Sequence, residues 1–148
     1  IAQHQDTTEP QKAAQEAGKL SIGYDSDMAQ FVGDTVLTGP VWNWGPYYTE
    51  RIKAAMDGTW KSGDFWGGIK EGTVMLAELS PRVPDDVKKT VEAEKAKFMS
   101  GEKTEFDIFA GPLKDNTGVE RLAAGQKMTQ EEIVNMDWFV EGVKGSTK

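Results

Sequence analysis

The chain has 148 residues, of which 38% are hydrophobic, and this is enough apolar material for one compact domain. Its 24 acidic and 17 basic side chains give a formal net charge of -7, so we expect no nucleic acid among its partners. The absence of Cys excludes disulfides and thiolate chemistry, and no apolar run approaches the roughly 20 residues of a membrane span.

The first third of the chain has the pattern of a βαβ unit. In chain order it predicts a strand, a helix and a strand over residues 1–5, 9–17 and 20–24. Thr8 is the expected N-cap of the helix, with Gln11 as its capping-box partner, and Gly18 suits the left-handed position after the last turn. Because the sequence begins at Ile1 inside a strand and without Met, we expect further residues upstream.

A third strand and a long helix follow this unit. A short connection over residues 28–33 leads to a strand over 35–41 and then to a helix over about 45–58. One face of this helix has apolar residues at helical spacing, which we expect to pack against a sheet: Tyr48, Ile52 and Ala55. Arg51 and Lys53 are expected to point away from that sheet.

The rest of the chain combines one well-specified helix with short elements. We expect a strand over residues 72–79, a surface helix over 84–100, a short strand over 106–110, a turn-rich stretch over 114–125 and a final helical turn. The surface helix has an acidic first turn and a basic last turn, which complement the helix dipole. Thr129 and Glu132 form the predicted capping-box pair of the final turn.

The residues of common catalytic sites are missing from the sequence. His4 is the single histidine and no G-x-S-x-G motif is present, which excludes a hydrolytic triad. One imidazole is too few for catalytic zinc, and the carboxylates lack the spacing of an EF-hand. We therefore expect a binding protein without metal or cofactor, and not an enzyme. The competing enzyme hypothesis would need two carboxylates side by side in a dry pocket.

Polar and aromatic residues stand just past the ends of the predicted strands, where open α/β sheets bind ligands. They form three groups: Gln5 and Asp6; Tyr24, Asp25 and Asp27; and Trp42, Asn43 and Trp44. The Asp6 and Asp25 carboxylates can accept hydrogen bonds from hydroxyls or purine N–H groups, and an indole can stack on a flat heterocycle. The alternatives are helix initiation for Asp6, a turn hydrogen bond for Asp25 or Asp27, and core packing for the indoles. At least one of Trp42 and Trp44 is expected to line a pocket.

Several segments together resemble the basic membrane protein family. They are G-Y-D-S-D-M over 23–28, V-W-N-W-G-P-Y-Y over 41–48, G-T-W over 58–60, W-G-G over 66–68, A-G-P-L-K-D over 110–115 and M-D-W-F-V-E-G over 136–142. The resemblance covers essentially the whole chain. It implies a type I periplasmic-binding fold, in which two α/β lobes close around a small molecule, and this chain would form the C-terminal part of that hinged fold.

The resemblance also implies a role and its partners. The role is the extracytoplasmic substrate-binding protein of an ABC importer, either periplasmic or lipid-anchored on the outer face of the cytoplasmic membrane. The partners would be a purine base or nucleoside, an ABC permease and the missing N-terminal part of the protein. Residues 1–41 are assigned to the second lobe, 42–75 to a crossover and the first lobe, and 76–148 to the second lobe and tail. The alternative is a sensory or regulatory module of the same fold that binds another small polar solute.

One residue carries over from the family's ligand site. Members that bind nucleosides use an aspartate of the G-x-D-S-D turn, and the matching position here is Asp25. They also have a lysine a few residues after a T-S pair of the next strand, where this sequence reads T-G-P-V-W over 38–42, without a lysine. That departure favours a free purine base such as adenine over its nucleoside. Because most of the first lobe would lie upstream of Ile1, the 148-residue chain alone is expected to bind weakly or not at all.

Overall fold

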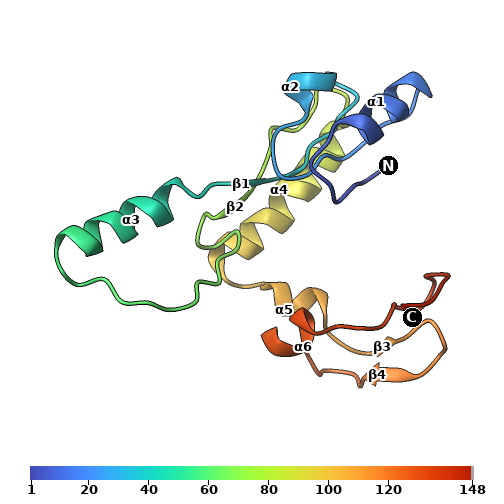
Figure 1. Cartoon of the computed structure of the whole chain (residues 1–148). Coiled ribbons are helices and arrows are strands. Elements are labelled where there is room, and N and C mark those ends of the chain that lie inside the picture. The colour runs from blue at the N-terminus through green and yellow to red at the C-terminus, as the bar shows by residue number, and fades with distance from the viewer. Residues whose placement is uncertain (148) are drawn as a thin grey trace. The chain divides into compact units, whose positions relative to one another are not determined.

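The computed structural model describes residues 1–147, which form an α/β fold in two compact units. Unit 1 spans Ile1–Gly101 and unit 2 begins at Glu102. Unit 1 contains α1 (Glu9–Glu16), α2 (Ala29–Val32), β1 (Pro40–Trp42), α3 (Gly45–Met56), β2 (Val74–Leu76) and α4 (Asp85–Ser100) (Figure 1). Unit 2 contains α5 (Glu105–Ile108), β3 (Leu113–Lys114), β4 (Glu120–Leu122) and α6 (Gln130–Val134). Among residues 1–147, every helix is too short or too polar to span a bilayer.

Short parallel pairings connect the first three extended segments of unit 1. Ala2 pairs with Ile22, and Ser21 pairs with Val36, both in parallel. Helix α1 lies between the first two segments in sequence, so the predicted βαβ order is confirmed. The paired stretches are shorter than the strands expected over 1–5, 20–24 and 35–41.

An antiparallel pair continues from the third segment. Pro40, Val41 and Trp42 of β1 face Leu76, Met75 and Val74 of β2. The strand predicted over 72–79 is therefore present, reduced to its central residues. Helix α3 leads away from β1, and the chain returns to β2 through residues 57–73 (Figure 1).

A close approach of two backbones requires glycine at position 39. A Cβ atom on Gly39 would lie 2.8 Å from both the carbonyl carbon and the oxygen of Gly23. The Gly23 N–H donates to the Thr38 carbonyl oxygen at 2.8 Å, which fixes this approach. Any side chain at position 39 would push the segments apart, and with them the turn that follows Gly23.

The core of unit 1 lies under that same turn. Met28, Val32 and Val36 form a buried cluster, with Met28 2% exposed and Val36 1% exposed. Burial of each such side chain stabilises the fold by about 1.5–3 kcal/mol. Residues 28–33, expected to be a plain connection, form helix α2 between Met28 and Gly33 because two of these core residues lie one turn apart on it.

Helix α1 follows its predicted bounds, but its predicted capping box is wrong. Thr8 is the N-cap and makes no side-chain capping hydrogen bond. Gln11 is fully buried, and its Nε2 instead donates to the Ile22 carbonyl oxygen at 3.2 Å. A buried amide needs a partner, and the neighbouring extended segment supplies one. Gly18 has the expected left-handed conformation with φ +65°.

Helix α3 exists as predicted, but its predicted packing face is wrong. Tyr48 is 57% exposed, Ile52 is 62% exposed and Ala55 is also exposed. Arg51, expected to point outward, is half-buried and its guanidinium lies 5.4 Å from the centroid of the Tyr47 ring. Aromatic side chains gather beside Tyr47 and cover that flank of the helix, which leaves the opposite flank open to solvent.

Helix α4 matches its prediction closely. It runs over Asp85–Ser100, has Asp85 and Asp86 in its first turn and stops at Gly101, whose φ is +78°. The left-handed conformation of Gly101 is the expected helix stop.

The start of unit 2 differs from its prediction. Residues 106–110 were expected to form a strand, and the structure has helix α5 there instead, followed by an antiparallel bridge from Ala110 to Lys127. The reason is a capping box: the Thr104 N–H donates to Asp107 Oδ2 at 2.8 Å and closes the first helical turn. This box was not recognised in the sequence.

The capping box at α6 is confirmed. The Thr129 N–H donates to Glu132 Oε2 at 2.7 Å, and the Glu132 N–H donates to Thr129 Oγ1 at 3.2 Å. These bonds hold the pKa of the Glu132 carboxyl below its ordinary value, mainly through the backbone N–H of Thr129.

Candidate functional site

Asp25 occupies the turn after the second parallel segment. It has φ 71°, the left-handed conformation that Asp and Asn tolerate better than most residues. Within residues 1–147 its carboxylate accepts no hydrogen bond. Asp27 behaves differently, because its Oδ1 accepts the Ala29 N–H at 3.1 Å. The turn-bonding alternative therefore holds for Asp27, while the Asp25 carboxylate is left available to a ligand.

Trp42 and Trp44 form a pair of exposed indoles beside this turn. Trp42 ends β1, and Trp44 is the N-cap residue of α3. Their rings are stacked with centroids 6.0 Å apart and an interplanar angle of 27°. The backbone N–H of Trp42 donates to the Asp25 carbonyl oxygen at 3.2 Å, so the structure brings Asp25 and Trp42 together. Trp42 is 42% exposed and Trp44 is 39% exposed, so both offer apolar surface to a planar partner.

Asn43 lies between Trp42 and Trp44 and bonds to the segment that precedes β2. Its Nδ2 donates to the Gly72 carbonyl oxygen at 3.0 Å, and its backbone N–H donates to the Thr73 carbonyl oxygen at 2.8 Å. Asn43 also contributes to a cavity of about 270 Å³ that is otherwise lined mainly by apolar side chains of β2 and the C-terminal half of α4. Its side-chain nitrogen is thus hydrogen-bonded to the backbone, and a ligand contact from Asn43 stays a prediction.

Gln5 and Asp6 lie past the first parallel segment. The Gln5 Nε2 donates to Thr7 Oγ1 at 3.3 Å. Asp6 is exposed, and within the described residues its carboxylate accepts no hydrogen bond and does not cap α1, whose N-cap is Thr8. Among residues 1–147, neither Gln5 nor Asp6 makes a hydrogen bond or ring contact with Asp25, Trp42 or Trp44.

The aromatic surroundings of the indoles were not predicted from the sequence. Trp44 also meets Tyr47 at 5.9 Å and Phe65 at 6.4 Å, and Tyr47 and Phe65 lie 4.3 Å apart between ring centroids. The spacing of Trp44 and Tyr47, three residues apart on a helix, signals their contact. Phe65 comes from the long segment after α3, and nothing in the local pattern indicates its position.

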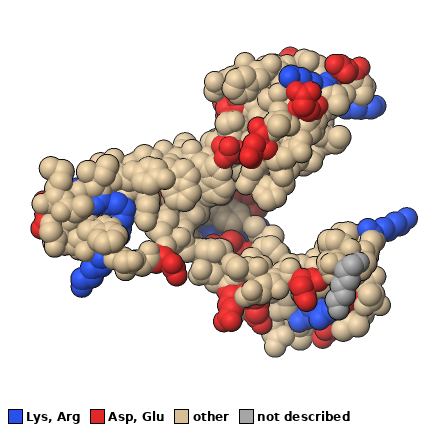
Figure 2. Space-filling view, in the orientation of Figure 1, with Lys and Arg blue, Asp and Glu red and all other residues tan. Residues whose placement is uncertain are grey.

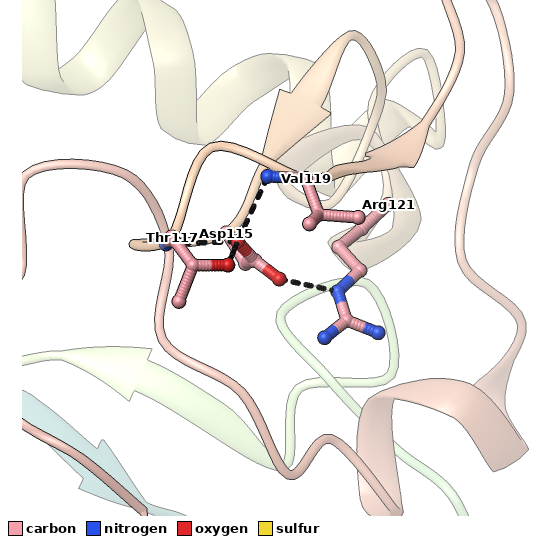
Figure 3. Close-up of polar contacts among 4 residues, drawn as sticks. All are labelled: Asp115, Thr117, Val119 and Arg121. Atoms are coloured by element: carbon pink, nitrogen blue, oxygen red, sulfur yellow. Dashed lines mark hydrogen bonds and ion pairs between the residues drawn. The ribbon is translucent and has the colours of Figure 1, made fainter.

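A buried carboxylate in unit 2 serves the fold. Asp115 is 2% exposed, and its Oδ1 accepts the Thr117 hydroxyl at 2.7 Å together with the N–H groups of Thr117 and Val119 (Figure 3). Its Oδ2 accepts Arg121 Nε at 2.8 Å. The Thr117 hydroxyl bond, aided by Arg121 and the backbone, holds the pKa of the Asp115 carboxyl far below its ordinary value against the opposing effect of burial. With its acceptors taken, Asp115 anchors the β3–β4 hairpin.

Acidic and basic side chains both lie on the surface of the described residues. On the face shown in Figure 2, Lys and Arg side chains are scattered among acidic ones. Among residues 1–147, no group of three or more His, Cys, Asp and Glu side chains is placed to hold a metal ion.

These features define a class of protein. In open α/β folds, residues just past the ends of parallel strands are where small molecules bind, and this unit has polar and aromatic residues at that place. The family described as ABC transporter substrate-binding protein, PnrA-like, matches residues 1–104. The chain belongs to this family, and the resemblance drawn from its motifs is thereby confirmed.

Two relatives of the chain have names that describe ligand-binding proteins. The chain is 44% identical over 143 residues to a purine-binding protein of Brucella abortus (strain 2308), covering 97% of this chain and 40% of that protein. It is 34% identical over 145 residues to a Haloferax volcanii protein provisionally named an ABC transporter glucose-binding protein, covering 98% of this chain and 34% of that protein. The chain thus spans about 40% or less of the length of these relatives.

A solved structure is also similar. The crystal structure of a transcriptional activator of the comK gene from Bacillus halodurans has a TM-score of 0.56 at 28% identity. That match covers 63% of this chain and 33% of the other.

Proposed function

We propose that this chain belongs to the extracytoplasmic ligand-binding component of an ABC importer and that its ligand is a free purine base. Membership of the PnrA-like family and the similarity to a purine-binding protein support this proposal. The observation that carries it is the pairing of Asp25 with Trp42. A backbone hydrogen bond of 3.2 Å joins Asp25, whose carboxylate is free, to Trp42, whose indole is exposed.

The mechanism is capture, without chemical change to the ligand. An ionised carboxylate only accepts hydrogen bonds, so Asp25 suits the amino or ring N–H groups of a purine. The Trp42 ring covers one face of the base, with Trp44 supporting it. Gln5, Asp6 and Asn43 are proposed as further ligand residues at the edge of the site.

The ligand binds between two lobes, which close around it by a hinge motion. We assign residues 1–41 to the second lobe, 42–75 to a crossover and the first lobe, and 76–148 to the second lobe and tail. The complex then delivers its ligand to a membrane permease from the periplasm or from a lipid anchor.

The absence of a lysine after Thr38 favours a base over a nucleoside. A ribose presents vicinal hydroxyls that need polar partners, and an indole supplies fewer of these than an ammonium does.

A sugar is the second candidate ligand, because the Haloferax volcanii relative bears the name of a glucose-binding protein. Carboxylates also accept pairs of sugar hydroxyls. A regulatory role for the same fold is favoured by the similarity to a transcriptional activator. That role would keep a ligand site and lose the permease as a partner.

A thermal-shift screen of the intact protein tests the ligand. The panel is adenine, guanine, adenosine, guanosine, glucose and ribose. A ligand at a hundred times its dissociation constant stabilises the native state by about 2.7 kcal/mol, which is a shift of several degrees. We expect a shift with adenine that is larger than the shift with adenosine, and its loss in Trp42→Ala. A shift with glucose and none with any purine would replace the base by a sugar.

A further inference from the structure

His4 lies beside Tyr24, the residue that precedes Asp25, because of the way the first two segments pair. Ala2 and Ile22 form the parallel bridge, and His4 and Tyr24 each follow it by two residues. Side chains two positions along paired strands stay on the same face of the sheet. The His4 and Tyr24 rings accordingly meet edge to face, with centroids 4.4 Å apart and an interplanar angle of 86°.

The backbone that carries His4 is held by its neighbour Gln3. The Gln3 Nε2 donates to the carbonyl oxygens of Gln5 and Thr7, both at 3.0 Å. The same nitrogen lies 2.9 Å from Met28 Sδ, in the core of unit 1. These contacts tie residues 5–7 to the core, so the position of His4 is set by the protein itself.

The polar atoms of His4 are available. Its side chain is exposed, and within residues 1–147 neither ring nitrogen takes part in a hydrogen bond. Tyr24 is half-buried and directly precedes Asp25. An edge-to-face contact with a phenol ring leaves the in-plane nitrogens of an imidazole able to donate and accept.

We propose that His4 is a specificity-determining residue that donates a hydrogen bond to a ring nitrogen of the bound base. This inference rests on the proposed purine ligand. One edge of adenine places the N7 acceptor next to the 6-amino donor. Asp25 accepts from the amino group, since an ionised carboxylate has no donor, and His4 donates to N7. Tyr24 positions the imidazole.

A paired change of ligand and residue tests this assignment in the intact protein. The probes are adenine and 7-deazaadenine, in which a C–H group replaces N7, and the variants are His4→Ala and His4→Phe. Loss of one neutral hydrogen bond weakens binding by about 3- to 10-fold. The native protein should therefore lose this factor on 7-deazaadenine. His4→Ala should lose it already on adenine and show no further loss on 7-deazaadenine.

His4→Phe separates binding from ring packing. It keeps an aromatic ring against Tyr24 and removes both nitrogens, so it should bind adenine as weakly as His4→Ala does. Native-like adenine affinity in His4→Phe, or equal affinity of the native protein for both probes, would overturn the role of His4 and leave the purine ligand standing. If the native protein binds neither probe, the proposed purine ligand itself fails.

Discussion

Replacement of Asp25 separates a ligand-binding carboxylate from a residue retained for its backbone conformation. Asp25 has φ 71°, which costs most side chains about 1–2 kcal/mol but is tolerated by Asp and Asn. Asp25→Asn therefore keeps the turn and removes only the charge, and we expect its free energy of unfolding to stay within about 0.5 kcal/mol of the native value. Asp25→Ala should lose about 1–2 kcal/mol through strain in the turn.

The effect on binding should be the same in both variants. A hydrogen bond to a charged group contributes about 1.5–3 kcal/mol, so either change should weaken adenine binding by about 10- to 150-fold. Titration calorimetry gives the affinities and urea denaturation gives the stabilities. Asp27→Asn is the matched control, because it removes the same charge two residues away from a side chain that already bonds the Ala29 N–H.

Two results would refute this reasoning. Native affinity in Asp25→Asn would show that the carboxylate does not contact the ligand. An equal loss of affinity in Asp27→Asn would show that the general negative charge of the turn matters, and not the position of Asp25.

Three further predictions concern the fold. Gly39→Ala should lower the melting temperature by several degrees in a calorimetric scan, because its Cβ would lie 2.8 Å from the Gly23 backbone; an unchanged melting temperature would show that the segments can separate freely. Thr129→Ala should cost about 1 kcal/mol in urea denaturation, through loss of the capping box, and Thr129→Ser should restore most of it. The folded-state pKa of Asp115 is depressed, so its stabilising contribution is complete above the ordinary Asp pKa of about 3.9 and is lost as the pH falls below it. The urea midpoint of Asp115→Asn should therefore depend less steeply on pH between about 5 and 2 than that of the native protein, and parallel curves would contradict this.

Local signals predicted the elements whose cause is local. The stop of α4 at Gly101 and the capping box of α6 depend on residues within one turn of each other, and both were found. The βαβ order of residues 1–41 was also found, because alternating hydrophobic stretches and turn residues mark it. The residues past the strand ends were identified for the same reason, since chain order alone places them there.

Long-range contacts account for the elements that were missed. Gln11 fits a capping box by spacing, but the burial of its amide against Ile22 depends on how α1 meets the sheet. The helical turn after Thr104 has a box of the same kind, hidden by the aromatic and β-branched residues that suggested a strand. His4 received no role in the sequence, because only the pairing of Ala2 with Ile22 brings it to Tyr24.

Helix α3 shows why periodicity identifies a helix and leaves its covered face open. Tyr48, Ile52 and Met56 follow one another at intervals of four residues, which makes an apolar flank, and yet all three are more than half exposed. The flank that is covered carries Tyr47, because Phe65 folds back onto it from a segment with no regular pattern. A hydrophobic stripe indicates that burying that face of the helix is favourable, but which segment covers it depends on the folded chain. The same argument applies to the site: the sequence supplies Asp25 and Trp42, and the backbone hydrogen bond from the Trp42 N–H to the Asp25 carbonyl oxygen, a property of the folded chain, brings the two residues together.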